Sequence, residues 1–526
     1  MKYPIGIQAF SNIIQEGYVY VDKTALIHKL VTTGKIYFLS RPRRFGKSLL
    51  ISTLKAYFQG KKELFRGLAM EKLETEWVEH PVFHLSFSTG NFTRGDELKN
   101  VLETFVADAE KEYGKSATTS LSVRFLKVIE AAYRKTGHGV VVLIDEYDKP
   151  LLDVLDTDIT VDVDGNKMQL EDYNRGLLKE MYSVFKDADE YLRFVLLTGV
   201  TKFSQVSVFS GFNQPKDISM DKRYDALCGI TKEELISYFS EQIKELADIN
   251  NVSEGEMTKQ LKHRYDGYHF SKGMTDIYNP FSLLNCFDSM DIKDYWFSTG
   301  TPTYLMRLLQ HFNYNINELV STYYTASEFV DYRADIEKPL PMIYQSGYLT
   351  IKDYDPIFET YLLDFPNNEV RGGFLAALSS GYFKEKSSMS WVRNISIALL
   401  QGDTEAFIRH ITALLAGVSY RFQRKDDAME CERYFQYTFY LILQMIGIYN
   451  TYVEKETSEG RIDCVVECPE HIYIFEFKLN GSAKKAIEQI NDRGYATPYL
   501  ADSRKMHKVG VNFSSEKGTI DEWIEN

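Results

Sequence analysis

The fold is decided by residues 35–58, which read KIYFLSRPRRFGKSLLISTLKAYF. Residues 35–40 form a short apolar run typical of a strand, and residues 49–58 have the apolar spacing of a helix. The loop between them ends in Gly46-Lys47-Ser48. Because the N–H groups of such a loop and the amino terminus of the following helix can bind phosphate oxygens, the stretch predicts a nucleotide-phosphate site.

This loop departs from the standard G-x-x-x-x-G-K-[ST] pattern, because Arg41 occupies the position of the first glycine. We expect Lys47 to reach the β- and γ-phosphates of ATP and the Ser48 hydroxyl to ligate Mg²⁺. The loop also holds the densest cluster of cationic residues in the chain, whose position favours nucleotide phosphates as its ligand. The residues expected around the nucleotide are Arg43, Arg44, Phe45, Gly46, Lys47, Ser48 and Leu49.

A second apolar run, residues 139–144, precedes two acids, Asp145 and Glu146. The pattern predicts a buried parallel strand with the acids at its carboxyl end. Asp145 could hold the Mg²⁺ shell, and Glu146 could orient or deprotonate the attacking water. The alternative is that both acids only begin a solvated loop before Pro150.

A third apolar run, residues 192–197, leads into Thr198-Gly199-Val200-Thr201-Lys202. In a parallel sheet its end would lie beside the strand that ends at Asp145. Thr198, Thr201 or Lys202 could therefore sense the γ-phosphate, and Thr198 is the residue we assign to the nucleotide site. A polar strand exit without this role is the alternative.

Near the carboxyl end, residues 460–467 and 471–479 predict two strands joined by a turn around Pro469. Alternation places Glu476 and Lys478 on the same face, and Asp463 on the partner strand can approach them. Two carboxylates and a backbone carbonyl suit Mg²⁺, and the lysine could position or help deprotonate water attacking a phosphodiester. A structural ion pair is the alternative.

Composition limits the remaining possibilities. The 526 residues are 44% hydrophobic and 26% charged, as in globular proteins, and are too many for one core. The formal net charge of −13 excludes a protein that coats nucleic acid, so any contact with DNA or RNA needs a local basic patch. The start of the chain has no secretory pattern, no apolar run could span a bilayer, and the cysteines are few; these features predict a cytoplasmic protein.

Five cysteines are present, and Cys464 and Cys468 form the one close pair among them. With His471 alone nearby they lack the ligands of a zinc site, and we interpret them as small apolar residues of a hairpin.

The first 300 residues resemble the AAA-ATPase-like family of bacterial and archaeal proteins. The resemblance rests on the RPRRFGKSLL loop at residues 41–50, on YVDKT at 20–24, on LIDEYD at 143–148 and on TGVTKFS at 198–204, and matches continue to YNPFSLL at 278–284. It implies an α/β fold with a P-loop parallel sheet, ATP and Mg²⁺ as ligands, and slow, switch-like hydrolysis.

The last 100 residues resemble the PD-(D/E)XK nuclease superfamily, in the form that is often fused to the AAA-ATPase-like domain. Asp463, Glu476-Phe477-Lys478 and the helix around Gln489 carry the resemblance, although Ile462 replaces the usual proline. It implies that Asp463 and Glu476 bind metal, that Lys478 serves the water, and that Glu432 and Gln489 are auxiliary.

Together these features predict a P-loop domain at 1–225, a helical lid at 226–300, a helical connector at 301–425 and a small α/β nuclease-like domain at 426–526. Lys262 and Arg264 of the lid could approach the nucleotide, although surface solvation is the simpler role. The expected function is an ATPase that regulates a metal-dependent nuclease acting on DNA or RNA, as a monomer or a homo-oligomer. A nucleotide-dependent switch or scaffold with an inactive nuclease fold and a pure ATPase motor are the alternatives.

Overall fold

The computed structural model of the chain consists of two compact units. One comprises residues 1–308 and 318–371, and the other comprises 309–317 and 372–526. The structure describes residues 1–163, 165–202, 215–297, 319–330, 339–382, 390–416, 435, 439, 442–443, 450–457 and 460–526. The helix expected at 303–309 lies outside these residues, and so does Glu432. The four-part division of the chain stays a prediction.

A five-stranded sheet in the order β2-β3-β6-β1-β7 forms the centre of the first unit, and all of its pairings are parallel. Its strands are β1 (Ile36–Ser40), β2 (Val82–Ser86), β3 (Val140–Asp145), β6 (Leu192–Gly199) and β7 (Lys216–Asp217). Every residue of β3 is buried, as expected for a parallel strand covered on both faces. Strand β6 lies between β1 and β3. The carboxyl ends of these neighbouring strands therefore carry the P-loop, the two acids and Thr198. The predicted α/β class is confirmed.

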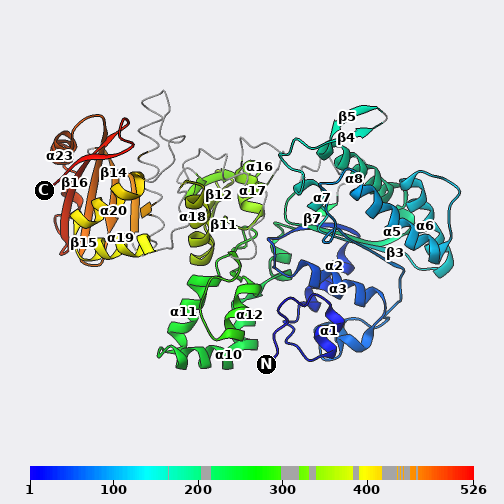
Figure 1. The fold of residues 1–526 in the computed structure, drawn as a ribbon. Helices are drawn as coiled ribbons and strands as arrows, with labels where there is room; N and C mark the ends of the chain where they lie inside the picture. Colours follow the sequence, from blue (N-terminus) through cyan, green and yellow to red (C-terminus); the bar gives the residue numbers. More distant parts are fainter. Residues whose placement is uncertain are drawn as a thin grey trace. The chain divides into compact units, whose positions relative to one another are not determined.

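The same part of the chain contains the helices α2, α3, α5, α6 and α8. Of these, α5, α6 and α8 pack on one another (Figure 1). The other elements of this part are small and include an exposed hairpin, β4 and β5. The bounds are α1 (Phe10–Gln15), α2 (Thr24–Thr33), α3 (Lys47–Phe58), α4 (Ala69–Leu73), β4 (Thr160–Val163), β5 (Asn166–Gln169), α5 (Glu97–Tyr113), α6 (Leu121–Thr136), α7 (Lys149–Leu152) and α8 (Leu170–Asp187).

The predicted lid is helical, and its three helices share one apolar core. Thr231 and Glu234 form a capping box at the start of α10. The lid elements are α10 (Lys232–Ile249), α11 (Glu254–Tyr265) and α12 (Pro280–Ser289), with the short strands β8 (Ile230–Thr231) and β9 (Ile277–Tyr278).

The following region is less helical than the sequence suggested. A three-stranded antiparallel sheet in the order β10-β12-β11 lies within the predicted connector. Its strands are short and rich in tyrosine. They lack the periodic pattern of apolar residues by which an element is identified from the sequence. The elements are β10 (Thr322–Thr325), α16 (Ala326–Phe329), α17 (Leu340–Gln345), β11 (Thr350–Asp355), β12 (Thr360–Asp364) and α18 (Asn368–Tyr382).

The second unit contains a mixed sheet in the order β13-β14-β15-β16-β17, in which the β15–β16 pairing is parallel and the others are antiparallel. Helix α23 lies between β15 and β16 in the sequence and packs on both, so it is the crossover that parallel strands require. The elements are α19 (Ser390–Leu400), α20 (Thr404–Ala416), β13 (Asn450–Thr457), β14 (Gly460–Glu467), β15 (His471–Leu479), α23 (Ala483–Asp492), β16 (Lys505–Ser514) and β17 (Thr519–Glu525). No helix among the described residues is long and apolar enough to cross a membrane.

Candidate functional sites

The loop between β1 and α3 has the conformation of a phosphate cradle. Gly46 is the N-cap residue of α3 with a φ of 96°, a region that favours glycine, and Arg44 is also left-handed with a φ of 66°. No side chain caps the helix, so its first-turn N–H groups are directed at the loop without a side-chain acceptor. Ser48 and Leu49 belong to this first turn. The local geometry therefore favours an anion at the start of α3.

Lys47 lies within this loop and is only 7% exposed. Its Nζ donates hydrogen bonds to the backbone carbonyls of Arg41 and Pro42, each at 2.9 Å. Burial lowers the pKa of the lysine, and the neighbouring Asp145, Asp148 and Glu146 oppose this shift. Both partners of the ammonium group are uncharged, so a phosphate group would bind it more strongly than they do.

The two acids after β3 lie next to the exit of β6. The Thr198 hydroxyl donates to Asp145 Oδ1 at 2.7 Å, and the backbone N–H of Glu146 donates to the same oxygen at 3.1 Å. Glu146 has a φ of 55°, which is uncommon for a residue with a side chain. Burial, and next to it the charge of Asp145, raises the pKa of Glu146. The structure thus brings together Lys47, Asp145, Glu146 and Thr198 around the ends of three adjacent strands.

The second constellation lies on β14, β15 and α23. Glu476 is 1% exposed, because apolar residues of β15 surround it on both faces. Asp463 Oδ2 accepts a hydrogen bond from the Phe477 N–H at 2.8 Å, so the aspartate lies against β15 as the hairpin predicted. Lys478 Nζ donates to Glu476 Oε1 at 3.0 Å and to Gln489 Oε1 at 2.8 Å. Four of the five residues that the sequence singled out for this site are therefore adjacent, and the fifth, Glu432, lies outside the described residues.

Glu476 Oε2 is buried and accepts no hydrogen bond from any described residue. Burial, followed by the proximity of Asp463, raises the pKa of Glu476 to about 7. A bare buried carboxylate oxygen beside a second carboxylate is a suitable ligand for a hard cation. The described residues contain no group of three or more acidic, histidine or cysteine side chains that could hold a metal. Asp463 and Glu476 supply two carboxylates, a donor set that fits Mg²⁺, which is commonly held by one or two carboxylates and several waters.

Comparison with known proteins agrees with this geometry. Residues 4–209 match a family model described as "Predicted AAA-ATPase", and residues 430–523 match the PD-(D/E)XK nuclease superfamily. The chain is also 36% identical over 530 residues to a protein of Azotobacter chroococcum mcd 1 described as "Uncharacterized protein in vnfD 5'region", and the match covers 99% of this chain and 98% of the relative.

The chain belongs to the AAA-ATPase-like family. Its carboxyl-terminal unit carries a PD-(D/E)XK nuclease superfamily domain. Both family assignments made from the sequence are confirmed.

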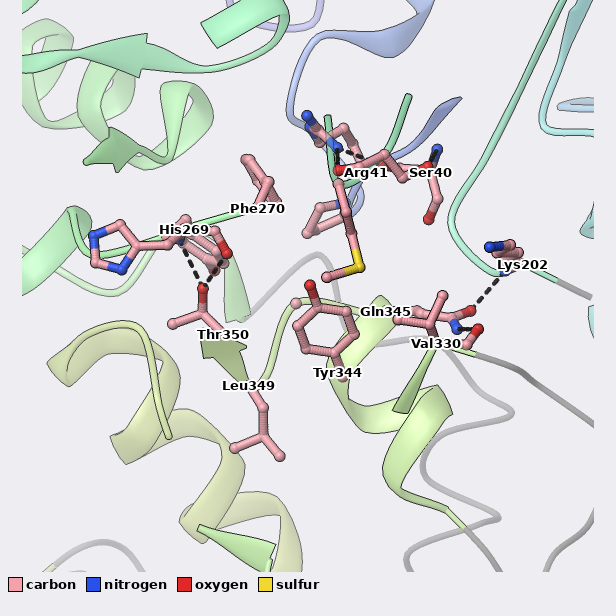
Figure 2. A pocket seen from close by; sticks show the side chains of 15 residues that line it. Ser40, Arg41, Lys202, His269, Phe270, Val330, Tyr344, Gln345, Leu349 and Thr350 are labelled. Carbon is pink, nitrogen blue, oxygen red and sulfur yellow. Dashed lines mark hydrogen bonds between the residues drawn. The ribbon is translucent and has the colours of Figure 1, made fainter. Parts of the chain in front are cut away.

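Arg41 of the AAA-ATPase-like domain is directed away from the phosphate site. Its guanidinium donates to the carbonyls of Ser40 and Ser219, at 2.9 and 2.8 Å, and lies 4.0 Å from the centre of the Phe270 ring. It lines a cavity in which Tyr344 approaches from the opposite side (Figure 2). The arginine is therefore a structural support beneath the loop, which explains how it can replace the first glycine.

The other cationic and aromatic residues of the loop contact the lid. The Arg44 guanidinium stacks over Phe281 at 4.0 Å from the ring centre, and Phe45 packs edge-on against Tyr268. The Arg43 carbonyl accepts a hydrogen bond from the Trp296 indole at 2.9 Å. Backbone and side chain of the loop thus join the P-loop to the lid.

Two further residues proposed as phosphate sensors have other partners. The Thr201 hydroxyl and N–H donate to Asp148 Oδ2 at 2.8 and 2.6 Å, and Val200 N–H donates to the same oxygen. Lys202 forms an ion pair with Asp217 at 2.6 Å. Asp148, to which the sequence analysis assigned no role, thus fixes the exit of β6 against the acidic loop.

The lid cations also have carboxylate partners. Lys262 lies 2.7 Å from Asp276, and Arg264 pairs with Asp294. These pairs are on the lid surface, in agreement with the simpler of the two predicted roles.

Sequence reasoning missed a cavity of about 100 Å³ beside the P-loop. Its walls are residues of the segment 19–23, Gly46 and Leu49 of the loop and helix, and residues 227–230 before the lid. The walls are mainly apolar, and Lys23, which is paired with Glu234, is the charged residue among them. The YVDKT segment at 20–24 was the available signal, but nothing in its composition indicated a cavity.

Proposed function

We propose that this protein is an ATP-binding and ATP-hydrolysing switch that regulates a Mg²⁺-dependent nuclease within the same chain. ATP binds at the P-loop of the AAA-ATPase-like domain, and the PD-(D/E)XK domain hydrolyses phosphodiester bonds of DNA or RNA. The low cysteine content supports a cytoplasmic location as part of this proposal.

The observation that carries the nuclease proposal is the bare Oε2 of Glu476. A structural ion pair with Lys478 would engage one carboxylate oxygen and would gain nothing from leaving the other buried without a donor. A bound cation satisfies this oxygen and offsets the repulsion between Glu476 and Asp463. The same site supplies an amine, Lys478, held in place by Gln489.

Mg²⁺ supplies charge stabilisation and a more acidic bound water when it occupies such a site. Asp463 and Glu476 are the residues that would hold it. Lys478, with Nζ fixed between Glu476 and Gln489, orients the attacking water and can exchange a proton with it. Its charge also favours the extra negative charge that the phosphate gains during attack.

The nucleotide proposal rests on the P-loop geometry and on the cavity next to it. Lys47 and the first turn of α3 bind the phosphates, while the apolar cavity beside Gly46 receives part of the nucleobase. Asp145, held by Thr198, belongs to the Mg²⁺ shell, and Glu146 orients the attacking water. The raised pKa of Glu146 brings it closer to the range in which a carboxylate acts as a general base.

The test is cleavage of single- and double-stranded DNA and RNA with Mg²⁺ or Mn²⁺, with and without ATP. We compare the native protein with Glu476→Ala and with Glu488→Ala, which removes an exposed glutamate from α23. Cleavage lost in Glu476→Ala and retained in Glu488→Ala is expected. Absence of metal-dependent cleavage from the native protein, with ATP and without it, would contradict the nuclease and favour a switch or scaffold.

A further inference from the structure

A chain of hydrogen bonds runs from the P-loop to the start of helix α18. The Arg43 carbonyl accepts from the indole N–H of Trp296 at 2.9 Å. The backbone N–H of Trp296 in turn donates to Glu369 Oε1 at 2.7 Å. Glu369 is the second residue of α18, is fully buried, and also accepts the hydroxyl of Ser282 at 2.7 Å on its other oxygen.

The P-loop end of this chain lies next to the carbonyls that Lys47 occupies. In the structure Lys47 donates to the carbonyls of Arg41 and Pro42, the two residues that precede Arg43. To bind a phosphate group, Lys47 must leave these carbonyls, and the loop backbone must then adjust next to Arg43. Nucleotide binding therefore acts on the residue whose carbonyl holds Trp296.

The other end of the chain lies in a helix that continues past the boundary of the unit. Helix α18 begins at Asn368, and the division between the two units falls between Arg371 and Gly372, inside this helix. Its first turn is fixed in the AAA-ATPase-like unit, because the Asn367 amide donates to the Asp266 carbonyl at 2.8 Å and Glu369 is anchored as described. A change at Glu369 is thus a change at the start of the segment that leads to the PD-(D/E)XK domain.

We propose that Trp296 and Glu369 are positioning residues that couple nucleotide binding at the P-loop to the stability of helix α18. This coupling rests on the proposed nucleotide site and does not require the nuclease to be active. A buried carboxylate with three donors is costly to disturb, so the chain responds as a unit. Binding of the nucleotide and ordering of α18 then favour each other by the same factor.

The test is hydrogen exchange of the full-length protein with and without a non-hydrolysable ATP analogue and Mg²⁺, with binding of the analogue measured separately. In the native protein we expect exchange of the amides at residues 370–382 to change by about fivefold or more on binding. Trp296→Phe keeps an aromatic ring and removes the indole N–H, so it should bind the analogue while losing most of this response. Glu369→Gln, which keeps the shape and removes the charge, should weaken the response as well.

Trp77→Phe is the matched control, because the Trp77 indole also donates to a backbone carbonyl, that of Glu74, at 3.1 Å and lies outside this chain of bonds. It should retain the native response. Binding of the analogue with unchanged exchange in α18 of the native protein, or a full response in Trp296→Phe, would overturn the coupling alone. Failure of the native protein to bind the analogue would overturn both the coupling and the proposed nucleotide site.

Discussion

The two lysines at the centre of the candidate sites have different partners. Lys47 donates to two backbone carbonyls of its own loop, whereas Lys478 donates to the side chains of Glu476 and Gln489. On the proposed function, a phosphate group would displace these neutral carbonyls, so the P-loop site would change on binding its ligand. The nuclease site is already assembled around its lysine and lacks a ligand on one oxygen, Glu476 Oε2. A site of the first kind suits a switch, and one of the second kind suits catalysis.

The largest effect is expected from Lys478→Met, which keeps the length of the side chain and removes the amine. Cleavage by the PD-(D/E)XK domain should fall about a thousandfold, because the water loses its orienting group. The fold should remain, since Met fits the half-buried site. Initial rates on a labelled substrate measure the effect, and Lys484→Met, an exposed lysine on α23, is the control. A loss below tenfold would mean that Lys478 serves structure and not catalysis.

Lys47→Ala tests the switch-like site. ATP hydrolysis should fall a few hundredfold, on the order of the loss expected when a phosphate group is no longer positioned. Phosphate release measures the rate, and Lys55→Ala in the same helix should retain it. Hydrolysis unaffected by Lys47→Ala would show that the carbonyl-bound lysine never moves to the nucleotide.

Asp266 of the lid is a second buried carboxylate, and it can be compared with Glu476 of the PD-(D/E)XK domain. Like Glu476 it is buried and carries oxygens without donors among the described residues, and burial raises its pKa to about 7. The folded protein thus retains a proton that the unfolded chain loses near pH 4, so stability falls as pH rises from about 4 to 7 and is level above that range. Asp266→Asn should remove this loss and raise the free energy of unfolding of its unit at pH 8 by on the order of 3 kcal/mol.

Melting temperature against pH, with and without Mg²⁺, measures this effect. The exposed Asp288→Asn on α12 should leave the profile unchanged. Mg²⁺ should not change the profile of Asp266, because the nearby acid, Asp276, is already paired with Lys262 and His269. An equally steep pH profile in Asp266→Asn would contradict the assignment.

Gln489→Leu tests how much of the nuclease site is preassembled. The substitution removes the acceptor of Lys478 Nζ and leaves Glu476 as its partner. Cleavage should fall about tenfold, as is common when a group that orients a catalytic residue is lost. The rate against Mg²⁺ concentration separates the two roles: a lower maximal rate at unchanged Mg²⁺ requirement supports positioning, and a raised requirement alone contradicts it.

The smallest effect is expected from Gly372→Ala. A Cβ at this exposed glycine would meet no atom within 4 Å, so the alanine should stabilise α18 by about 0.5–1 kcal/mol. Because the boundary of the units falls here, the stiffer helix should also enlarge the part of α18 that responds to nucleotide. Hydrogen exchange reports both effects. Gly176→Ala in α8, equally exposed and open, should add stability without altering the response.

Much of the fold could be predicted because its signals are local. The buried run before Asp145 and the apolar run before Thr198 identified two strands, and the position of β6 beside β3 followed from their shared polar ends. The alternation along β15 placed Glu476 and Lys478 on one face, which the hydrogen bond between them agrees with. Apolar runs and alternating patterns are local signals, so the sequence alone was enough to identify these strands.

The remainder depended on contacts between distant residues. Arg41 is adjacent to Lys47 in the loop, yet its direction is set by Ser219 and Phe270, far along the chain. The strands of the antiparallel sheet β10-β12-β11 contain no continuous apolar run such as that of β3, so no local signal identified them. The role of Thr201 also depends on a distant residue, because its hydrogen-bond partner Asp148 follows a different strand.

The span of each site along the chain has a consequence for how the protein is made. Asp463, Glu476, Lys478 and Gln489 all lie within one hairpin and the helix that follows, so this site closes through short loops and can form quickly. Lys47, Asp145 and Thr198 must be gathered from three separated strands, which is a slower search. Synthesis, however, delivers the slow part first. The ribosome therefore releases the fast-assembling PD-(D/E)XK fold after the domain that precedes it, which by then has had time to fold.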